Sequence, residues 1–247
     1  MRRSLTTALA VIAFSMQLHA AATPPHRSTY KPGLILQWKD RLHAANVALQ
    51  QAKWSEGLAI SDSVLREMRD RIASGEASGD LLAAAVLFRA IGEAGLNRED
   101  GAAWDFGVAQ SLYSPYEKVD LKPYGAAGSL LDRHRYTNGV PPRSPVDLQD
   151  LSKSGGEVTA PRKIKAVPAE YPLAKRASCQ QDVVVVKAVI DQQGRTVSPS
   201  LPTRRDPVLA LAAFDAIRSW VFEPATQDGK PVAVGFILSV NFKVRGC

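Results

Sequence analysis

Cysteine and histidine are scarce in this chain of 247 residues, which has two cysteines, Cys179 and Cys247, and four histidines. Zinc sites need three or four such ligands close together, and no group in the sequence has that spacing. The sequence also lacks a Gly-x-Ser-x-Gly elbow, a glycine-rich phosphate loop and a Cys-His pair. We therefore expect neither a metal centre nor a cofactor, and we predict that the protein is not an enzyme.

A long apolar run occurs only near the amino terminus. The basic start Met1-Arg2-Arg3 precedes an apolar stretch over residues 5–18 and the small residues Ala20-Ala21-Ala22. A membrane-spanning helix needs about 20 apolar residues, and this stretch is shorter and contains Thr, Ser and Gln. We interpret residues 1–22 as a signal peptide that is cleaved after Ala20 or Ala22. The alternative is a short anchor retained in the inner membrane.

Positive charge is concentrated in the last third of the chain. The whole sequence carries a formal charge of +7, and the part from Pro161 onward has thirteen Lys or Arg against seven Asp or Glu. Behind a signal peptide, the available anions are acidic protein segments and envelope polymers rather than nucleic acid. Export by the signal peptide indicates a periplasmic protein, in a compartment whose oxidising conditions allow a disulfide.

Residues 34–112 have the composition and the periodicity of a helical module. Apolar residues recur at helical spacing and predict four helices, over residues 35–52, 54–73, 80–95 and 98–112. The small and aromatic residues Trp54, Gly57, Ala102, Phe106 and Ala109 resemble the packing pattern of tetratricopeptide repeats. The alternative is an unrelated layer of helical hairpins, and the pattern does not indicate what such a module binds.

Residues 113–160 are rich in proline and glycine. This composition is typical of a linker, and the sequence predicts only one short helix in it, near residues 126–133.

The last third has a different periodicity. The β-branched run of residues 183–190 predicts a buried strand, and Gly194 lies in a turn that leads to a shorter strand over residues 195–200. Asp206-Pro207 is a helix start, and apolar residues predict a helix that continues to Phe222. Strict alternation over residues 234–244 predicts a final, half-buried strand.

These elements follow the order strand, strand, helix, strand. A hairpin followed by a helix that crosses the sheet places the first strand between the other two, so that all three are antiparallel. We therefore expect an α+β protein, with amino-terminal helical hairpins and a carboxy-terminal ββαβ domain whose three-stranded sheet has the order 2-1-3. The same geometry brings Cys179 and Cys247 together and predicts a disulfide between them; the alternative is two free thiols.

Several spaced motifs in this region agree with one known family. They are Pro168-Ala169-Glu170-Tyr171-Pro172, Ile190-Asp191-x-x-Gly194, Ala216-x-Arg218-x-Trp220-x-Phe222-Glu223-Pro224, Gly229-Lys230-Pro231-Val232 and Val240-Asn241-Phe242-Lys243-Val244. In this order they resemble the carboxy-terminal domain of TonB-type energy transducers. The resemblance covers about residues 161–245, and we expect a TonB-like domain over residues 161–247.

The resemblance implies a periplasmic domain that binds the TonB box, an extended peptide segment of an outer-membrane receptor, as an added strand beside the last strand. The implied binding residues are Tyr171, Pro172, Gly235, Phe236, Ile237, Leu238, Ser239, Val240, Asn241 and Phe242. Tyr171 also has a purely structural interpretation, in which its ring packs under the sheet.

The resemblance implies energy-coupled envelope transport, with inner-membrane proton-driven motor proteins as further partners. This chain departs from the family in its short apolar segment and in the helical module, which replaces most of the Pro-rich arm. The alternative is a soluble periplasmic adaptor or scaffold without energy coupling.

Overall fold

The computed structural model describes residues 32–71, 79–142, 146–147, 153, 156–172, 175 and 181–243. Residues Lys31–Cys247 form one compact unit. The expected signal peptide, residues 1–22, and both cysteines of the expected disulfide lie outside the described residues, so these two expectations remain predictions. Within the described part of the chain, every helix is too short or too polar to span a bilayer.

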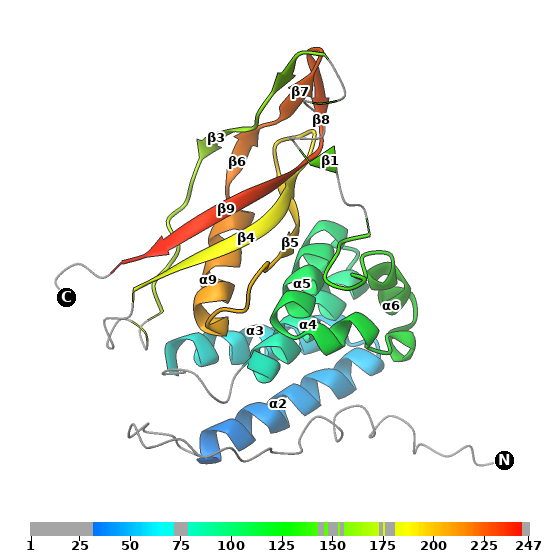
Figure 1. Cartoon of the computed structure of the whole chain (residues 1–247). Helices are drawn as coiled ribbons and strands as arrows, with labels where there is room; N and C mark the ends of the chain where they lie inside the picture. The colour runs from blue at the N-terminus through cyan, green and yellow to red at the C-terminus, as the bar shows by residue number, and fades with distance from the viewer. Residues whose placement is uncertain are drawn as a thin grey trace. The chain divides into compact units, whose positions relative to one another are not determined.

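Four α-helices open the described chain, close to the positions that the sequence predicts (Figure 1). They are α2 (Pro32–Gln50), α3 (Trp54–Arg71), α4 (Gly79–Gly95) and α5 (Glu99–Leu112). Ala52 and Asn97 follow α2 and α4 with φ angles of 59° and 57°, and this left-handed conformation commonly ends a helix. Neighbouring helices approach closely at Gly57, where a Cβ atom would lie 2.5 Å from Leu49 Cγ.

Helix α4 lies at the centre of the helical layer. It contacts α2, α3, α5, the short helix α6 (Gly125–Asp132) and the later helix α9 (Pro207–Arg218). Its side chains are buried around most of its circumference, including Leu82, Val86 and Ile91. A helix that is apolar on all sides is stable only when other elements surround it. Helix α4 therefore holds the helical layer together.

The stretch expected to be a linker contains more structure than the single helix predicted for it. Two 3-10 helices, η1 (Ser114–Lys118) and η2 (Lys122–Tyr124), precede α6. Leu121 and Leu131 are buried in the helical core, and the Tyr124 hydroxyl donates to Asn46 Oδ1 at 2.6 Å. Residues 114–132 thus complete the helical layer. The domain boundaries at residues 113 and 161 remain predictions.

The main sheet has the order β1-β9-β4-β5. Strand β4 (Asp182–Ile190) is antiparallel to both β5 (Thr196–Ser200) and β9 (Val234–Phe242). The expectation of a three-stranded, fully antiparallel sheet was incomplete, because β1 (Val146–Asp147) pairs with β9 in parallel. A two-residue strand is too short to produce a period in the sequence.

Two small sheets extend beyond the main one and were not predicted. One contains β2 (Val158–Thr159), β7 (Ala225–Gln227) and β8 (Lys230–Val232), and the other contains β3 (Arg162–Lys165) and β6 (Val221–Glu223). Asp228 and Gly229 connect β7 to β8 with φ angles of 50° and 75°, as a tight two-residue hairpin requires.

Helix α9 begins as predicted and ends earlier. The Asp206 carboxylate accepts hydrogen bonds from the backbone N–H groups of Val208 and Leu209, at 3.0 and 3.2 Å. The helix ends at Arg218 rather than Phe222. Phe222 lies in β6, where its N–H donates to the Gly194 carbonyl at 2.9 Å. This bond to the β4–β5 turn favours an extended conformation over a further helical turn.

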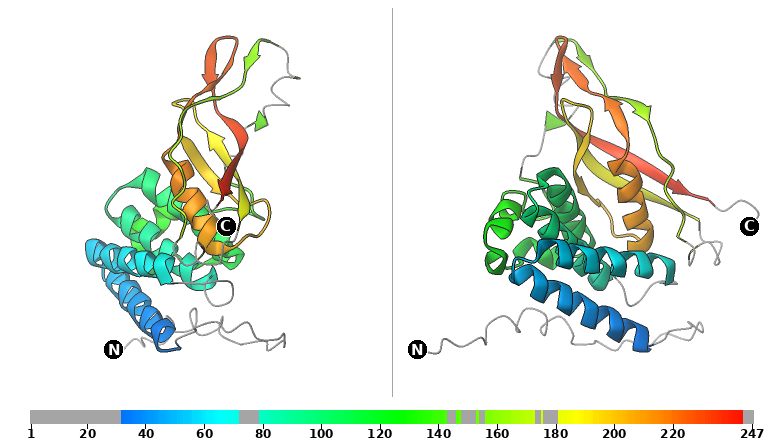
Figure 2. Two further views of the ribbon diagram at one scale, coloured as in Figure 1. Left: turned by 90° about the vertical axis from the view of Figure 1, so that its left-hand side faces the viewer. Right: turned by 180° about the vertical axis from the view of Figure 1, so that it is seen from behind.

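Helix α9 is buried on two sides. One side packs against β4, β5 and β9, and the other contacts α4 and α5 (Figure 2). The Phe214 side chain is fully buried, and its ring meets that of Trp104 of α5 edge to face, with centroids 6.5 Å apart. The core of the helices and the core of the sheet therefore form one continuous cluster.

Because this core is shared, Phe214→Ala should lower the free energy of unfolding by about 3–5 kcal/mol. The helices and the strands should still unfold in a single transition. Denaturant unfolding monitored by far-UV circular dichroism and by tryptophan fluorescence measures both quantities.

The matched control is Leu36→Ala, at a position whose side chain is 61% exposed, which should change stability by less than about 0.5 kcal/mol. Two separate transitions in the wild type, or an unchanged midpoint in Phe214→Ala, would contradict the shared core.

Candidate functional site at the outer edge of strand β9

Strand β9 has one buried face and one exposed face, as its alternation predicts. Leu238, Val240 and Phe242 are buried, whereas Ile237 is 62% exposed. All nine residues of β9 pair with β4, without a bulge, from Val234 opposite Ile190 to Phe242 opposite Asp182. The strand is therefore held firmly along one side.

The direction of the free backbone groups follows from this register. The Asp191 N–H donates to the Arg195 carbonyl at 2.9 Å, so the backbone groups of Asp191 point toward β5. The direction of the backbone groups alternates from one residue to the next along a strand. The groups of Ile190, and of every second residue before it in β4, therefore point toward β9. Across an unbroken register, Val234 and every second residue after it bind β4. The N–H and C=O groups of Gly235, Ile237, Ser239 and Asn241 consequently point to the outer edge.

The structure separates Gly235 from the other members of the expected binding set. Gly235 pairs with Asp147 of β1, so its share of the edge is already occupied by the chain itself. Within the described residues, no strand pairs with the outer edge of β9 over residues 236–242. The open part of the edge therefore begins after Gly235. Strand β1 was not predicted from the sequence.

Tyr171 and Pro172 lie at the other end of β9, where both are buried. The Tyr171 ring packs edge to face on Phe242, with centroids 5.6 Å apart. Burial raises the pKa of Tyr171 above its ordinary value. Tyr171 thus supports the inner face of β9, which agrees with the structural interpretation of this residue.

The segment that carries Tyr171 is fixed at both ends. Trp220 Nε1 donates to the Val167 carbonyl at 2.9 Å. At the other end, the buried Lys175 forms an ion pair with Asp206, the residue that caps α9. These contacts hold residues 167–172 against α9 and keep Tyr171 under the strand.

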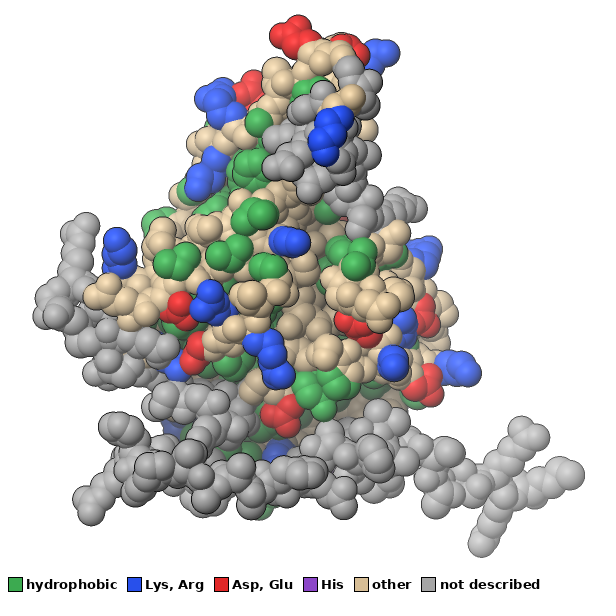
Figure 3. Space-filling view, viewed as in Figure 1, with side chains coloured by type: hydrophobic (Ala, Val, Ile, Leu, Met, Phe, Trp, Pro, Cys, Tyr) green, Lys and Arg blue, Asp and Glu red, His purple; other side chains and the backbone are tan. Residues whose placement is uncertain are grey.

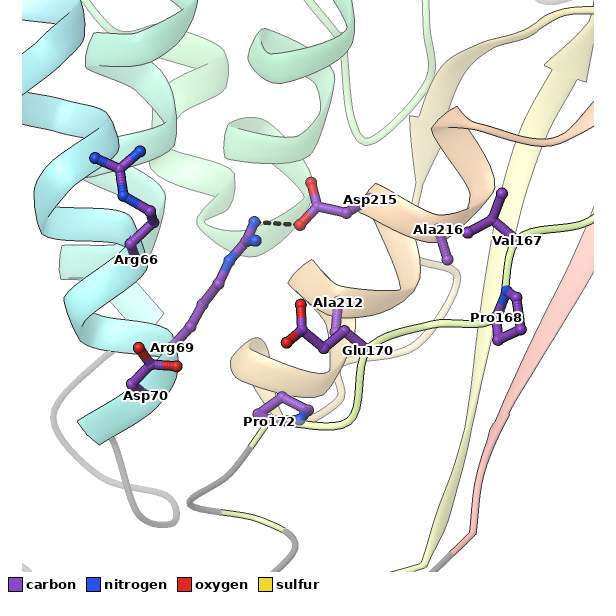
Figure 4. A pocket seen from close by; sticks show the side chains of 10 residues that line it. All are labelled: Arg66, Arg69, Asp70, Val167, Pro168, Glu170, Pro172, Ala212, Asp215 and Ala216. Carbon is purple, nitrogen blue, oxygen red and sulfur yellow. Dashed lines mark hydrogen bonds and ion pairs between the residues drawn. The ribbon is translucent and has the colours of Figure 1, made fainter.

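A pocket of about 370 Å³ lies between this segment, α3 and α9 (Figure 4). Arg69 of α3 reaches across it and forms an ion pair with Asp215 of α9. Burial raises the pKa of Asp215 above its ordinary value, although the charges of Arg69, Arg89 and Arg218 oppose this shift. The pair links the helical layer directly to α9.

A second ion-pair cluster joins the same two parts. The Asp105 side chain of α5 is 1% exposed and accepts two hydrogen bonds from Arg89 of α4, at 2.7 and 2.8 Å. Arg218, at the end of α9, lies 3.3 Å from the same carboxylate. Asp105 therefore forms ion pairs with two cations where the helices meet the sheet domain. These residues have no distinctive spacing in the sequence, so sequence reasoning missed their role.

Among the residues that the structure describes, no three His, Cys, Asp or Glu side chains gather in a way that could hold a metal ion.

Residues 167–244 match the family described as Gram-negative bacterial TonB protein C-terminal. This match confirms the resemblance that the motifs predicted. It covers about a third of the chain, and helices α2 to α6 lie outside it. Domains of this family are periplasmic and interact with outer-membrane receptors. Comparison of the chain with curated proteins gave no match.

The ion pairs of Asp105 with Arg89 and Arg218 should contribute to the stability of the fold. Asp105→Ala leaves Arg89 and Arg218 without their shared carboxylate, and removal of one partner from a buried pair costs about 3–5 kcal/mol. Asp100→Ala is the matched control on the same helix, because Asp100 is 83% exposed in its pair with Arg195 and should cost less than about 1 kcal/mol.

Both values come from denaturant unfolding of the purified variants. Equal losses for the two substitutions would show that Asp105 does not hold the two parts together.

Proposed function

We propose that this protein binds an extended segment of an outer-membrane receptor, which adds as a strand to the outer edge of β9, and that it takes part in energy-coupled envelope transport. The family match of residues 167–244 supports this proposal. So does the open edge of β9, because an unpaired strand edge presents donors and acceptors that an extended peptide can satisfy. No catalytic step is part of the proposal.

The observation that carries the proposal is the difference between the two edges of the main sheet. Helix α5 covers the β5 edge, where the Tyr136 hydroxyl and Ser111 Oγ donate to the Pro199 carbonyl at 2.7 and 3.3 Å. The β9 edge lies at the opposite side of β4, and only its first two residues pair with β1. Most of the β9 edge is therefore unpaired within the described residues.

The charge of the region favours an acidic partner. The chain from Pro161 onward has an excess of six positive charges. Lys187 is exposed on β4, next to β9, and Lys243 is exposed directly after β9. Complementary charge accelerates association and selects among partners more than it adds affinity. We accordingly expect that the receptor segment is acidic and that its association slows as salt concentration rises.

Ser239→Pro tests strand addition, because proline removes an outward N–H that β4 does not use. Loss of one backbone hydrogen bond should weaken peptide binding about 2- to 12-fold. Combined with Ile237→Pro, which removes a second outward donor, the substitution should weaken binding about 4- to 150-fold. Titration of a labelled acidic receptor segment by fluorescence anisotropy measures the effect.

Ser239→Ala is the matched control, because it removes the hydroxyl and keeps the N–H, so it should bind as the wild type does. Undiminished binding by a correctly folded double-proline variant would refute the edge as the binding site.

A second candidate function is that of a soluble periplasmic adaptor, in which the helical layer binds one protein and the TonB-like part another. The extent of the helical layer favours it, since α2 to α6 occupy the place of the arm that a transducer uses to span the periplasm.

The fate of residues 1–22 distinguishes the two candidates. Amino-terminal sequencing of protein from purified inner membranes should give an intact terminus if the chain is a transducer. A mature chain that starts at Ala21 or Thr23 in the soluble periplasm would instead establish the adaptor.

The disulfide between Cys179 and Cys247 stays a prediction. The pairing of Asp182 with Phe242 places the start of β4 beside the end of β9, which is the arrangement that such a bond needs.

A further inference from the structure

Strand β1 and Ile237 together constrain how a partner strand can align on β9. Of the four residues whose backbone groups point outward, Gly235 is paired with β1. The open outward positions in the described part of β9 are therefore Ile237, Ser239 and Asn241, and Ile237 is the first of them after β1.

Ile237 differs from the other two in its side chain. All three lie on the exposed face of the sheet, where Ser239 and Asn241 are polar and Ile237 is 62% exposed. The residue opposite Ile237 on β4 is Lys187, and the next two residues on that face of β4 are Val185 and Val183. Hydrophobic side chains gather in Figure 3 over the strands that Figure 1 labels β4 and β9. Ile237 belongs to β9 and therefore lies on the side of this apolar area that a partner strand would meet.

An added strand would cover the open side of Ile237. Residues directly opposite each other on neighbouring strands hold their side chains on the same face, with Cβ atoms about 5 Å apart. Pairs of β-branched or aromatic side chains in this position are favourable. A partner residue opposite Ile237 therefore determines whether this exposed side chain is buried or stays in water.

We propose that the partner strand places an apolar side chain, β-branched or aromatic, directly opposite Ile237, and that this pair fixes the register of the bound strand. The inference rests on strand addition at β9, the proposed function. A slip by one residue would turn the apolar side chain to the other face. A slip by two residues would place it opposite Gly235, where β1 lies, or opposite the polar Ser239.

The test uses the full chain and a set of synthetic peptides. Each peptide is a run of threonines with glutamate at both ends and a single valine that moves by one position from peptide to peptide. The wild type should bind one placement of the valine about two- to fivefold more tightly than the others, as measured by fluorescence anisotropy.

Ile237→Thr keeps the β-branched shape and the backbone N–H, so this variant should bind all peptides with similar affinity and lose the preference. Val183→Thr is the matched control: Val183 is an exposed valine on the same face, but it lies on β4 rather than on the edge strand, and the preference should survive. Equal affinity for every placement in the wild type, or a preference that persists in Ile237→Thr, would overturn the proposal. Absence of binding by all peptides would instead contradict strand addition itself.

Substitutions in β1 test whether this strand limits the register. Substitution of both Val146 and Asp147 with proline removes the Val146 N–H, the one donor of these two residues that the register directs at β9. The weakened β1 should release Gly235, so that a second placement, two positions away, gains affinity. Substitution of both with alanine keeps the donors and should leave a single preferred placement. A single preferred placement in the proline variant would show that β1 does not limit the register.

Discussion

Helix α9 is the element on which the rest of the structure depends, because its side chains are apolar on two sides and both must be covered. The sheet covers one side, and helices α4 and α5 cover the other. Phe214 and Trp104 meet across the second contact, while Arg69–Asp215 and the Asp105 cluster fix the helices in place around it. Without the helical layer, α9 would expose an apolar face, which soluble proteins avoid at this size.

The way in which α9 is covered also explains which surface remains for binding. Helix α5, which packs on α9, also contacts β5 and so covers that edge of the sheet. The segment of residues 167–172 lies beside α9, and its Tyr171 ring packs on Phe242 on the buried face of β9. Strand β9 is therefore rigidly held but open at its outer edge, and a rigid edge loses little entropy when a peptide binds.

Much of this fold could be predicted from the sequence, because helices of three or more turns and strands of nine residues produce clear periods. That is why α2 to α5, β4 and β9 were found close to their positions. Strands of two to four residues, such as β1, β3 and β6, are too short for this signal. The docking of the helices could not be predicted either, since Arg89 and Asp105 resemble ordinary charges on an exposed helix face. At the candidate site, strand β9 itself was predicted close to its observed bounds, and its role in binding stays a proposal. The closure of Gly235 by β1 depends on a tertiary contact.

Residue-resolved amide hydrogen exchange, with and without a bound acidic receptor segment, tests the central claim most directly. If the segment adds to β9, the amides of Ile237, Ser239 and Asn241 gain protection, because these N–H groups point to the outer edge and acquire a partner. The amides of Leu238 and Val240, which already bind β4, should change little. Protection that appears instead on β5 or on the helices, with the β9 amides unchanged, would contradict the account.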